Sequence, residues 1–497
     1  MGRGLLVAGT TSDAGKSVVT TGICRALSRR GLSVAPFKAQ NMSNNSMVTV
    51  DPVTGTGSEI GRAQWIQAVA ARAVPEPAMN PVLLKPGSDR TSHVVVMGAP
   101  AGRLEAGEFA GGRKHLADAA FAALDELRSR FDVVVCEGAG SAAEINLRAH
   151  DYVNMGLARH GAMPTILVGD IDRGGVFASM YGTLALLDAG DQALIRGFVV
   201  NKFRGDVGLL RPGLDSLEAL TGRPVLGVLP WQRDLWIDSE DSLALTSRPA
   251  HDGAGVLTVA VVMLPRISNF TDVDALCLEP DVRVRFVDDP RALAGTDAVI
   301  LPGTRATLAD LAWLRSRGLD VALREHARRG GAVLGICGGF QMLGAVIEDP
   351  DGVEGVPGSS AEGLGLLDVR TVFAREKALR LPTGSALGVA ASGYEIHHGR
   401  ITVGSAEEFL GGARAGSVFG TMWHGSLEGD ALRAAWLREV ATAADREVRT
   451  GVVSFPAARE ARLEALADLI EEHLDVDLLL GMLADEPVLP TLTGTLS

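Results

Sequence analysis

The chain has 497 residues, more than one domain usually holds, and this length predicts two to four domains. A formal charge of −13 without any basic block argues against a nucleic-acid partner, and no apolar run is long enough to span a membrane. Four widely spaced cysteines without a CxxC pair predict neither a zinc site nor a disulfide framework, and they favour a reducing, cytoplasmic setting. These properties leave the oligomeric state open.

The first eighteen residues combine a short apolar run, a glycine-rich turn and the start of a helix. Gly9 to Ser17 read GTTSDAGKS and satisfy the GxxxxGK[ST] pattern of a phosphate-binding loop. The backbone N–H groups of such a loop and the start of the next helix form an anion site, and Gly9 and Gly15 permit the tight turn. We therefore predict that Gly9, Thr10, Gly15, Lys16 and Ser17 bind ATP, with Lys16 on the outer phosphates and Ser17 on Mg²⁺.

A second predicted strand completes a βαβ opening and leads into the polar segment KAQNMSNNS, residues 38–46. A run so rich in Asn and Ser would usually be a solvated loop. Here it follows the carboxyl end of a strand beside the phosphate loop, and open α/β sheets bind ligands at that edge. We therefore predict a substrate loop that uses Lys38, Gln40, Asn41 and Asn44.

Three later apolar runs also end in polar residues, as buried parallel strands do when their carboxyl ends share one edge. FDVVVCE ends at Glu137, which is placed either to be a second anchor for Mg²⁺ or to cap the next turn. PTILVGDIDRGG places Asp172 after a strand, and its role stays open. FVVNK contains Asn201, which is placed either to read a purine ring or to cap a turn. Lys85 and Ser88 are weaker site candidates, because support of the core explains them almost as well.

Strands alternate with helices through residues 1–246, which predicts an α/β fold with a doubly wound parallel sheet. The segment SRPAHDGAG, residues 247–255, loses apolar periodicity and gathers Pro, Asp and Gly, which indicates a linker. A second α/β domain is expected over residues 256–460, followed by a C-terminal amphipathic helix and tail over residues 461–497.

The second domain carries a cysteine in a setting typical of a nucleophile. In GAVLGICGGFQMLG, apolar strand residues lead directly into Cys337 and two glycines, and a helical segment follows. The sharp turn exposes the thiol, and the start of the helix favours the thiolate, which is the reactive species. Backbone N–H groups of Gly338 and Gly303 are candidates for the two halves of an oxyanion hole.

A cysteine nucleophile needs a nearby base. The downstream candidates are His397 and His398 in GYEIHHG and His424 in SVFGTMWHG. We favour His424, because it is a single histidine at the end of a predicted strand.

The order of GTTSDAGKS, KAQNMSNNS, EGAGSAAEINL, DIDRGGVF, NKFRGD, LPGT, CGGFQMLG, GYEIHHG and WHGSLEG resembles that of the cobyric acid synthase family, glutamine-dependent amidotransferases of cobalamin biosynthesis. The likeness covers nearly the whole chain. It implies a first half similar to dethiobiotin synthetase and a second half similar to class I glutamine amidotransferases, with Cys337 as nucleophile and His424 as catalytic histidine. Glutaminases of that class carry Glu two residues after the histidine, a position that is Ser426 here. Either the pair therefore works without a third member, or another carboxylate such as Glu428 orients the ring.

The resemblance implies ATP-dependent amidation of the b, d, e and g carboxylates of adenosylcobyrinic acid a,c-diamide, giving adenosylcobyric acid, with ammonia released from glutamine. ATP, Mg²⁺, glutamine and a corrinoid are the small molecules that it implies. Ammonia is protonated in water at neutral pH, so a protected path for it is expected. Two alternatives stay open. One is cobyrinic acid a,c-diamide synthase, which shares the two-domain plan, and the other is a P-loop nucleotide switch whose second domain only binds a partner.

Overall fold

The computed structural model describes residues 2–87, 91–105, 114–232, 256–484 and 489–492. The chain divides into a first unit of residues 1–42, 49–238 and 460–497 and a second unit of residues 43–48 and 239–459. The predicted linker at 247–255 and Ser88 lie outside the described residues, so both stay predictions. Within the described ranges, no helix combines the length and apolar character needed to cross a membrane.

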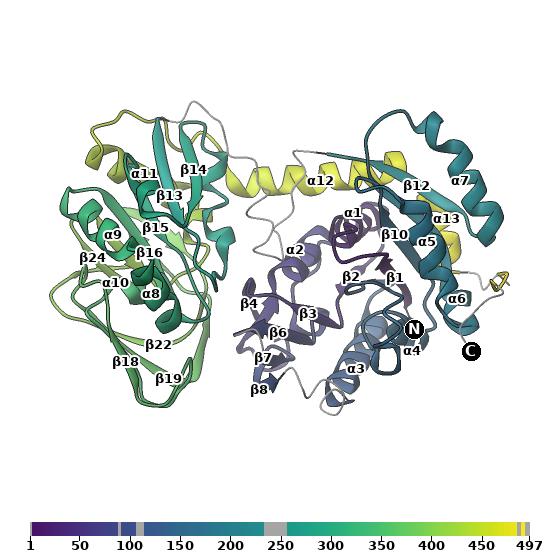
Figure 1. The fold of residues 1–497 in the computed structure, drawn as a ribbon, viewed down its shortest axis with the longest axis horizontal. Coiled ribbons are helices and arrows are strands. Elements are labelled where there is room, and N and C mark those ends of the chain that lie inside the picture. Colours follow the sequence, from purple (N-terminus) through teal and green to yellow (C-terminus); the bar gives the residue numbers. More distant parts are fainter. Residues whose placement is uncertain (1, 88–90, 106–113, 233–255, 485–488, 493–497) are drawn as a thin grey trace. The chain divides into compact units, whose positions relative to one another are not determined.

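The first unit is built on a six-stranded parallel sheet with the strand order β12-β11-β10-β1-β9-β2 (Figure 1). Its strands are β1 (Arg3–Gly9), β2 (Val34–Phe37), β9 (Val133–Glu137), β10 (Thr165–Asp170), β11 (Ile195–Phe203) and β12 (Val225–Pro230). Strands lie on both sides of β1, with β10, β11 and β12 on one side and β9 followed by β2 on the other, which is the pattern of a doubly wound sheet. The predicted fold class is therefore confirmed for this unit.

Helices cover both faces of this sheet, which is why its strands are apolar throughout. Leu5 and Val7 of β1 share one core with Leu466 and Ile470 from the far end of the chain, while Leu6 on the opposite face is equally buried. The helices of the unit are α1 (Lys16–Arg29), α2 (Arg62–Ala70), α3 (Lys114–Arg130), α4 (Met155–Gly161), α5 (Val176–Ala185), α6 (Ala189–Leu194), α7 (Val207–Thr221), α12 (Phe455–His473) and α13 (Val476–Met482).

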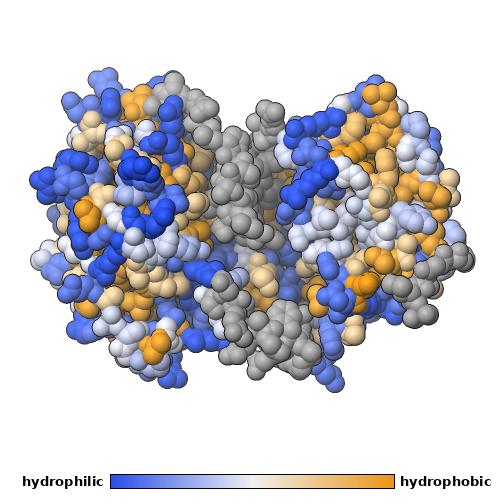
Figure 2. All heavy atoms as spheres, viewed as in Figure 1, coloured by the Kyte–Doolittle hydropathy of each residue, from blue (hydrophilic) through white to orange (hydrophobic). Residues whose placement is uncertain are grey.

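Helix α7 buries only part of its apolar surface. Leu214 and Leu217 face the protein interior, whereas Leu209 and Leu220 are exposed. Figure 2 shows the apolar surface that results over this helix.

The polar segment that the sequence predicts as a loop contains two short strands, β3 (Gln40–Met42) and the start of β4 (Ser46–Val50). Strand β3 pairs in parallel with β6 in a sheet of order β3-β6-β7-β8. The remaining strands here are β5 (Gly57–Gly61), β6 (Val82–Pro86), β7 (Thr91–Val96) and β8 (Ala99–Glu105). Most of the segment is buried and parts of it form strands, so it is not the irregular loop that the sequence predicts, while its role in binding a substrate stays a prediction. Strand pairing and contacts between buried amides, such as that of Asn41 with Gln64, provide partners for polar groups of this segment in place of water.

The second unit contains a seven-stranded sheet of order β14-β13-β15-β16-β25-β24-β23, in which the first five strands are parallel. These strands are β13 (Leu257–Val262), β14 (Val282–Val287), β15 (Ala298–Leu301), β16 (Ala332–Ile336), β23 (Glu407–Phe409), β24 (Gly412–Ala415) and β25 (Val418–Thr421). The helices are α8 (Thr307–Ser316), α9 (Leu319–Arg328), α10 (Gly338–Leu343) and α11 (Asp430–Ala443). This unit also has the α/β architecture that the sequence predicts.

A smaller sheet of order β18-β17-β19-β22 belongs to the same unit. Its strands are β17 (Val346–Asp349), β18 (Ser359–Glu362), β19 (Val369–Arg380) and β22 (Glu395–Val403), and a separate hairpin consists of β20 (Thr383–Ala386) and β21 (Val389–Ser392). Strand β22 carries the GYEIHHG histidines and pairs antiparallel with β19.

Helix α12 begins in the second unit and continues into the first at residue 460. The fully buried Arg25 guanidinium of α1 lies 2.6 Å from a carboxylate oxygen of Glu460 and 2.7 Å from one of Glu464. A buried arginine without a countercharge is costly, so these carboxylates fasten the C-terminal helix to α1.

Candidate functional sites

The phosphate loop lies between the end of β1 at Gly9 and the start of α1 at Lys16, so the strand-turn-helix setting that its motif requires is present. Gly15 has a φ of +92°, which favours glycine. Three backbone carbonyls accept hydrogen bonds from Lys16 Nζ, those of Thr11 at 2.9 Å, Ser12 at 3.1 Å and Gly140 at 3.0 Å. The loop therefore curves around the ammonium group.

Ser17 and Glu137, the two predicted metal anchors, lie side by side. The Ser17 hydroxyl donates to Glu137 Oε1 at 2.9 Å, and Glu137 is buried at the end of β9. Lys38 Nζ lies 2.9 Å from the same carboxylate oxygen, and Gln67 donates to Oε2 at 2.5 Å. Sequence reasoning misses Gln67, because its position in α2 gives no sign of where the side chain points.

The charge on Glu137 is maintained by its neighbours. Burial by itself would raise the pKa of this carboxyl, but Lys38 and Gln67 outweigh burial and lower the pKa. A carboxylate beside a hydroxyl suits Mg²⁺, which prefers oxygen ligands. Among the described residues, no group of three or more His, Cys, Asp or Glu side chains could hold a metal ion. An ion at this position would therefore take its other ligands from phosphate and water.

The residues predicted for the substrate loop divide between the units. Lys38 lies beside Glu137, Asn41 donates to Gln64 Oε1 at 2.8 Å, and Gln40 accepts a hydrogen bond from the hydroxyl of Tyr152. Asn44 belongs to residues 43–48 of the second unit. In that stretch the Ser46 N–H donates to Asn269 Oδ1 at 2.9 Å.

Asn201 supports the phosphate loop directly. Its side-chain Nδ2 donates to the carbonyl of Ala14 at 2.9 Å. A Cβ at Gly15 would lie 2.0 Å from that nitrogen, so a larger residue does not fit there. A role for Asn201 in reading the purine stays a prediction.

Lys85, one of the weaker candidates, and Asp172, whose role the sequence leaves open, both lie beside an oppositely charged side chain. Lys85 forms a buried ion pair with Glu59 at 2.5 Å, which fits the interpretation as core support. Asp172 lies 3.4 Å from the Arg204 guanidinium.

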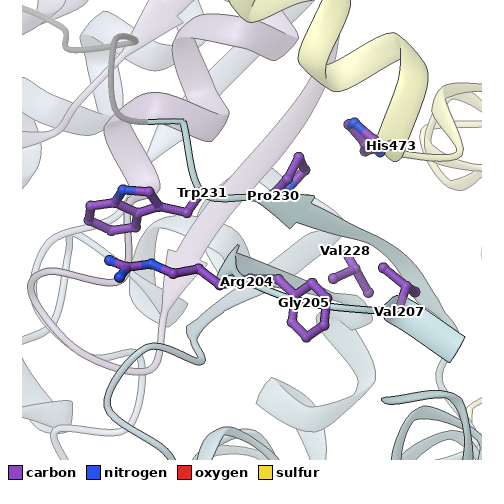
Figure 3. A pocket seen from close by; sticks show the side chains of 8 residues that line it. Arg204, Gly205, Val207, Val228, Pro230, Trp231 and His473 are labelled. Carbon is purple, nitrogen blue, oxygen red and sulfur yellow. The ribbon is translucent and has the colours of Figure 1, made fainter. Parts of the chain in front are cut away.

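A cavity of about 560 Å³ lies at the carboxyl ends of β11 and β12 (Figure 3). Trp231 and Arg204 lie at one end and His473 at the other, with Val207 and Val228 between them. The Arg204 guanidinium is 4.6 Å from the centre of the Trp231 ring. An indole face with a guanidinium stacked on it offers a surface for a flat aromatic ring.

In the second unit, Cys337 occupies the turn between β16 and α10. Its φ of 51° and ψ of −109° are rarely adopted by a residue with a side chain and persist only where the surrounding chain enforces them. A Cβ at Gly339 would lie 1.9 Å from the carbonyl oxygen of Leu301, so the turn requires glycine there. The turn is the sharp strand-to-helix connection that the sequence predicts, but Cys337 is buried where the sequence predicts an exposed thiol, and α10 has only six residues.

His424 lies beside this thiol and is held by a carboxylate. Its Nδ1 is 2.7 Å from Asp272 Oδ2, and the Gly425 N–H donates to Asp272 Oδ1 at 2.7 Å. The Tyr394 ring stacks on the imidazole with centroids 5.4 Å apart. Burial disfavours the imidazolium, but Asp272 and the sulfur of Cys337 together raise the pKa of His424 to about 10. The arrangement therefore favours a protonated ring next to the sulfur.

Asp272 is the residue that sequence reasoning misses. It lies in the 3₁₀ helix η4 (Phe270–Val273), 152 positions from His424 in the chain. Glu428, which the sequence offers as one alternative, instead places its carboxylate 2.5 Å from the Arg459 guanidinium. In the sequence, the polar stretch SNFTDVD after β13 is the signal that points to Asp272. It does not lie at a characteristic distance along the chain from His424, so the pairing of the two residues cannot be predicted from it.

The two glycines predicted for the oxyanion hole lie near the Cys337 and His424 pair, since Gly338 follows Cys337 in the chain and Gly303 lies close to the His424 ring. A Cβ at Gly303 would be 2.8 Å from His424 Cε1, and one at Gly338 would be 2.7 Å from Thr304 Cγ2. Asp310 holds the turn that carries Gly303, since it accepts from the Thr304 hydroxyl at 2.5 Å. Stabilisation of an oxyanion by these two N–H groups stays a prediction.

These features define a class of protein in which one chain joins a P-loop nucleotide-binding unit to a unit with the thiol turn of a class I glutamine amidotransferase. Family models agree: the CobQ/CobB/MinD/ParA nucleotide binding domain matches residues 5–243, and the CobB/CobQ-like glutamine amidotransferase domain matches residues 258–432. The chain belongs to the cobyric acid synthase family.

Two relatives illustrate the relationship. The cobyric acid synthase of Mycolicibacterium gilvum (strain PYR-GCK) is 66% identical over 486 residues, which cover 98% of this chain and 97% of the relative. That of Mycobacterium ulcerans (strain Agy99) is 68% identical over 480 residues, which cover 96% of each chain. A crystal structure of a glutamine amidotransferase is 23% identical with a TM-score of 0.30, and the match covers 38% of this chain and 98% of that one.

Proposed function

We propose that this chain catalyses the ATP- and glutamine-dependent amidation of corrinoid carboxylates, namely the b, d, e and g side chains of adenosylcobyrinic acid a,c-diamide. The observation that carries the proposal is the Cys337–His424–Asp272 arrangement in a chain that also contains a phosphate loop. The names of the relatives support the same assignment.

The second unit would release ammonia from glutamine. The sulfur of Cys337 attacks the carboxamide carbon, and N–H groups of Gly338 and Gly303 stabilise the oxyanion. His424 gives its proton to the departing nitrogen, so that ammonia leaves and a thioester remains. Water then attacks the thioester, its proton passes to His424, and glutamate is released. Asp272 holds the ring in the required tautomer and stabilises its charged form.

The first unit would activate the acceptor carboxylate. A carboxylate oxygen of the corrinoid takes the γ-phosphoryl group of ATP, which gives an acyl phosphate and ADP. Ammonia then attacks the acyl carbon and phosphate leaves. Lys16 binds the outer phosphates, and Lys38 provides a second buried cation beside them. Ser17 and Glu137 would hold Mg²⁺, which neutralises charge on the phosphates when it is bound.

The cavity beside Trp231 is a candidate binding site for the purine ring of ATP. It lies at the same edge of the sheet as the phosphate loop, and its indole face suits a purine ring.

Incubation with ATP, glutamine and adenosylcobyrinic acid a,c-diamide, followed by mass spectrometry, tests the proposal. We expect the b, d, e and g carboxylates to be amidated in a reaction that requires ATP, with ammonia able to replace glutamine. In a parallel incubation with cobyrinic acid as the corrinoid, amidation confined to the a and c carboxylates would instead identify the first alternative enzyme. Glutamine hydrolysis that survives Cys337→Ala would remove the catalytic assignment from the second unit.

A further inference from the structure

A buried imidazole nitrogen near Cys337 is not used by the steps above. His397 lies on β22 directly after Ile396, whose carbonyl oxygen is 3.9 Å from Cys337 Sγ. The His397 side chain is 11% exposed, and its Nδ1 is 2.9 Å from the carbonyl oxygen of Gly399. A carbonyl can only accept, so Nδ1 carries the hydrogen. Nε2 of the neutral ring is therefore a hydrogen-bond acceptor.

This Nε2 has no hydrogen-bond partner among the residues that the structure describes, although it is buried. The carboxylate oxygen Oε2 of Glu395 faces it at 3.9 Å, beyond hydrogen-bond distance. Both atoms are acceptors, so two lone pairs face each other with no hydrogen between them. Buried polar atoms usually have partners, and a positively charged N–H group would supply one for Nε2 and would also pair with the carboxylate of Glu395, which has a hydrogen bond with Trp423 as well.

The surroundings keep the ring of His397 neutral. Burial lowers its pKa most, and the charges of Arg400, His424 and Arg380 act in the same direction, so that the pKa falls to about 4. The contribution of His424 also shows that His397 lies within electrostatic range of the imidazole that serves Cys337.

We propose that His397 Nε2, with Glu395 opposite, is the binding position for an ammonium-type N–H donor in the glutaminase reaction. Two sources share this chemistry, the α-ammonium group of glutamine and the ammonium formed from the released nitrogen. The inference rests on the proposed glutaminase function of the second unit. It adds the residue that either recognises the amino-acid part of the substrate or receives the product.

The test compares His397→Leu with the wild type in the full chain. Two amides are used as substrates, glutamine and glutaramate, which has the same carboxamide but no α-amino group. His398→Leu is the matched control, because His398 is the neighbour on β22 and directs its Nδ1 to the carbonyl of Ala374 at 3.1 Å. His397→Gln keeps an acceptor at a similar position and should restore part of the wild-type behaviour.

If the donor is the α-ammonium group, His397→Leu raises KM for glutamine roughly 10- to 100-fold with little change in kcat, because one charged hydrogen bond is lost. KM for glutaramate then stays unchanged, so the wild-type preference for glutamine disappears. If the donor is released ammonium, the preference is kept, and inhibition of glutamine hydrolysis by added ammonium weakens by a similar factor.

The proposal is overturned if His397→Leu keeps both the substrate preference and the ammonium inhibition of the wild type and of His398→Leu. That result leaves glutamine hydrolysis by the wild type, and so the proposed function, intact. A wild type that does not hydrolyse glutamine contradicts the proposed function instead. Hydrolysis of glutaramate, which the second unit would catalyse, shows that this unit of the variant is folded, and His397→Phe provides the same comparison if the Leu variant does not fold.

Discussion

The imidazole of His424 and the carboxylate of Asp272 lie 2.7 Å apart, although 152 positions separate the two residues in the chain. The Gly425 N–H donates to the second oxygen of the same carboxylate, so the orientation of Asp272 is fixed from two sides. A carboxylate that holds Nδ1 in this way leaves Nε2 for the nucleophile. We therefore propose that Asp272 takes the role of the acidic residue that is missing at Ser426.

We expect Asp272→Asn to lower kcat for glutamine hydrolysis roughly 10²- to 10⁴-fold, because the ring is then held in the wrong tautomer. Amidation with ammonia should be unaffected. Parallel assays of glutamate release and of amide formation measure the two effects. Glu428→Gln is the control, since Glu428 contacts Arg459. Greater loss in Glu428→Gln than in Asp272→Asn would contradict this account.

The same variant should change the pH dependence. Burial opposes protonation of His424, but Asp272 and Cys337 raise its pKa to about 10, so loss of the Asp272 charge lowers that pKa. The alkaline limb of the kcat/KM profile for glutamine should therefore move to lower pH in Asp272→Asn. An alkaline limb that does not move argues against coupling between the two groups.

The stability of the wild-type protein should also fall as the pH rises, because His424 then loses its proton. The pKa of His424 lies above its usual value of 6.5, so its contribution to stability is fully present below pH 6.5 and is lost as the pH rises to about 10. The wild-type melting temperature should fall over this range more than that of Asp272→Asn. Thermal unfolding at a series of pH values measures the difference.

Cys337→Ala should abolish glutamine-dependent amidation, with a fall of at least about 10³-fold in glutamine hydrolysis, because the nucleophile is removed. Ammonia should still support amidation, since the first unit is unchanged. Cys277→Ala is the matched control, because it removes a thiol of the same unit that donates to the backbone carbonyl of Val273 at 3.7 Å. Equal loss with both nitrogen donors would show instead that the variant is damaged as a whole.

Glu137→Gln should destabilise the protein by about 3 kcal/mol, because it leaves Lys38 buried beside a neutral group. The double variant Lys38→Met, Glu137→Gln should recover most of this free energy of unfolding, yet it should not amidate, since both charged groups serve the phosphates in the proposed reaction. Urea denaturation and amidation assays separate the two properties. Independent, additive losses of stability would contradict the pairing.

The parts of the molecule that the sequence predicts well are those whose information is local. The phosphate loop and the Cys337 turn each place a strand, a glycine and a reactive residue within a short stretch, and both have the predicted strand-turn-helix setting. Asp272 depends on a contact between distant segments, which no spacing reveals. Residues 38–46 are rich in amides, a composition that is typical of solvated loops. An amide can pair with a buried partner as readily as with water, as Asn41 does with Gln64, so the composition does not reveal the burial.

The path of α12 has a consequence for dissecting the enzyme. Residues 460–497 complete the core of the first unit with Leu466 and Ile470, and Glu460 and Glu464 supply the counterions of Arg25. In chain topology, the second unit is thus an insertion within the first rather than an appended module. A chain that is truncated at the predicted linker would lack the C-terminal helices that complete the core of the first unit. A free-standing ligase therefore has to be made by joining these helices to the N-terminal part of the chain.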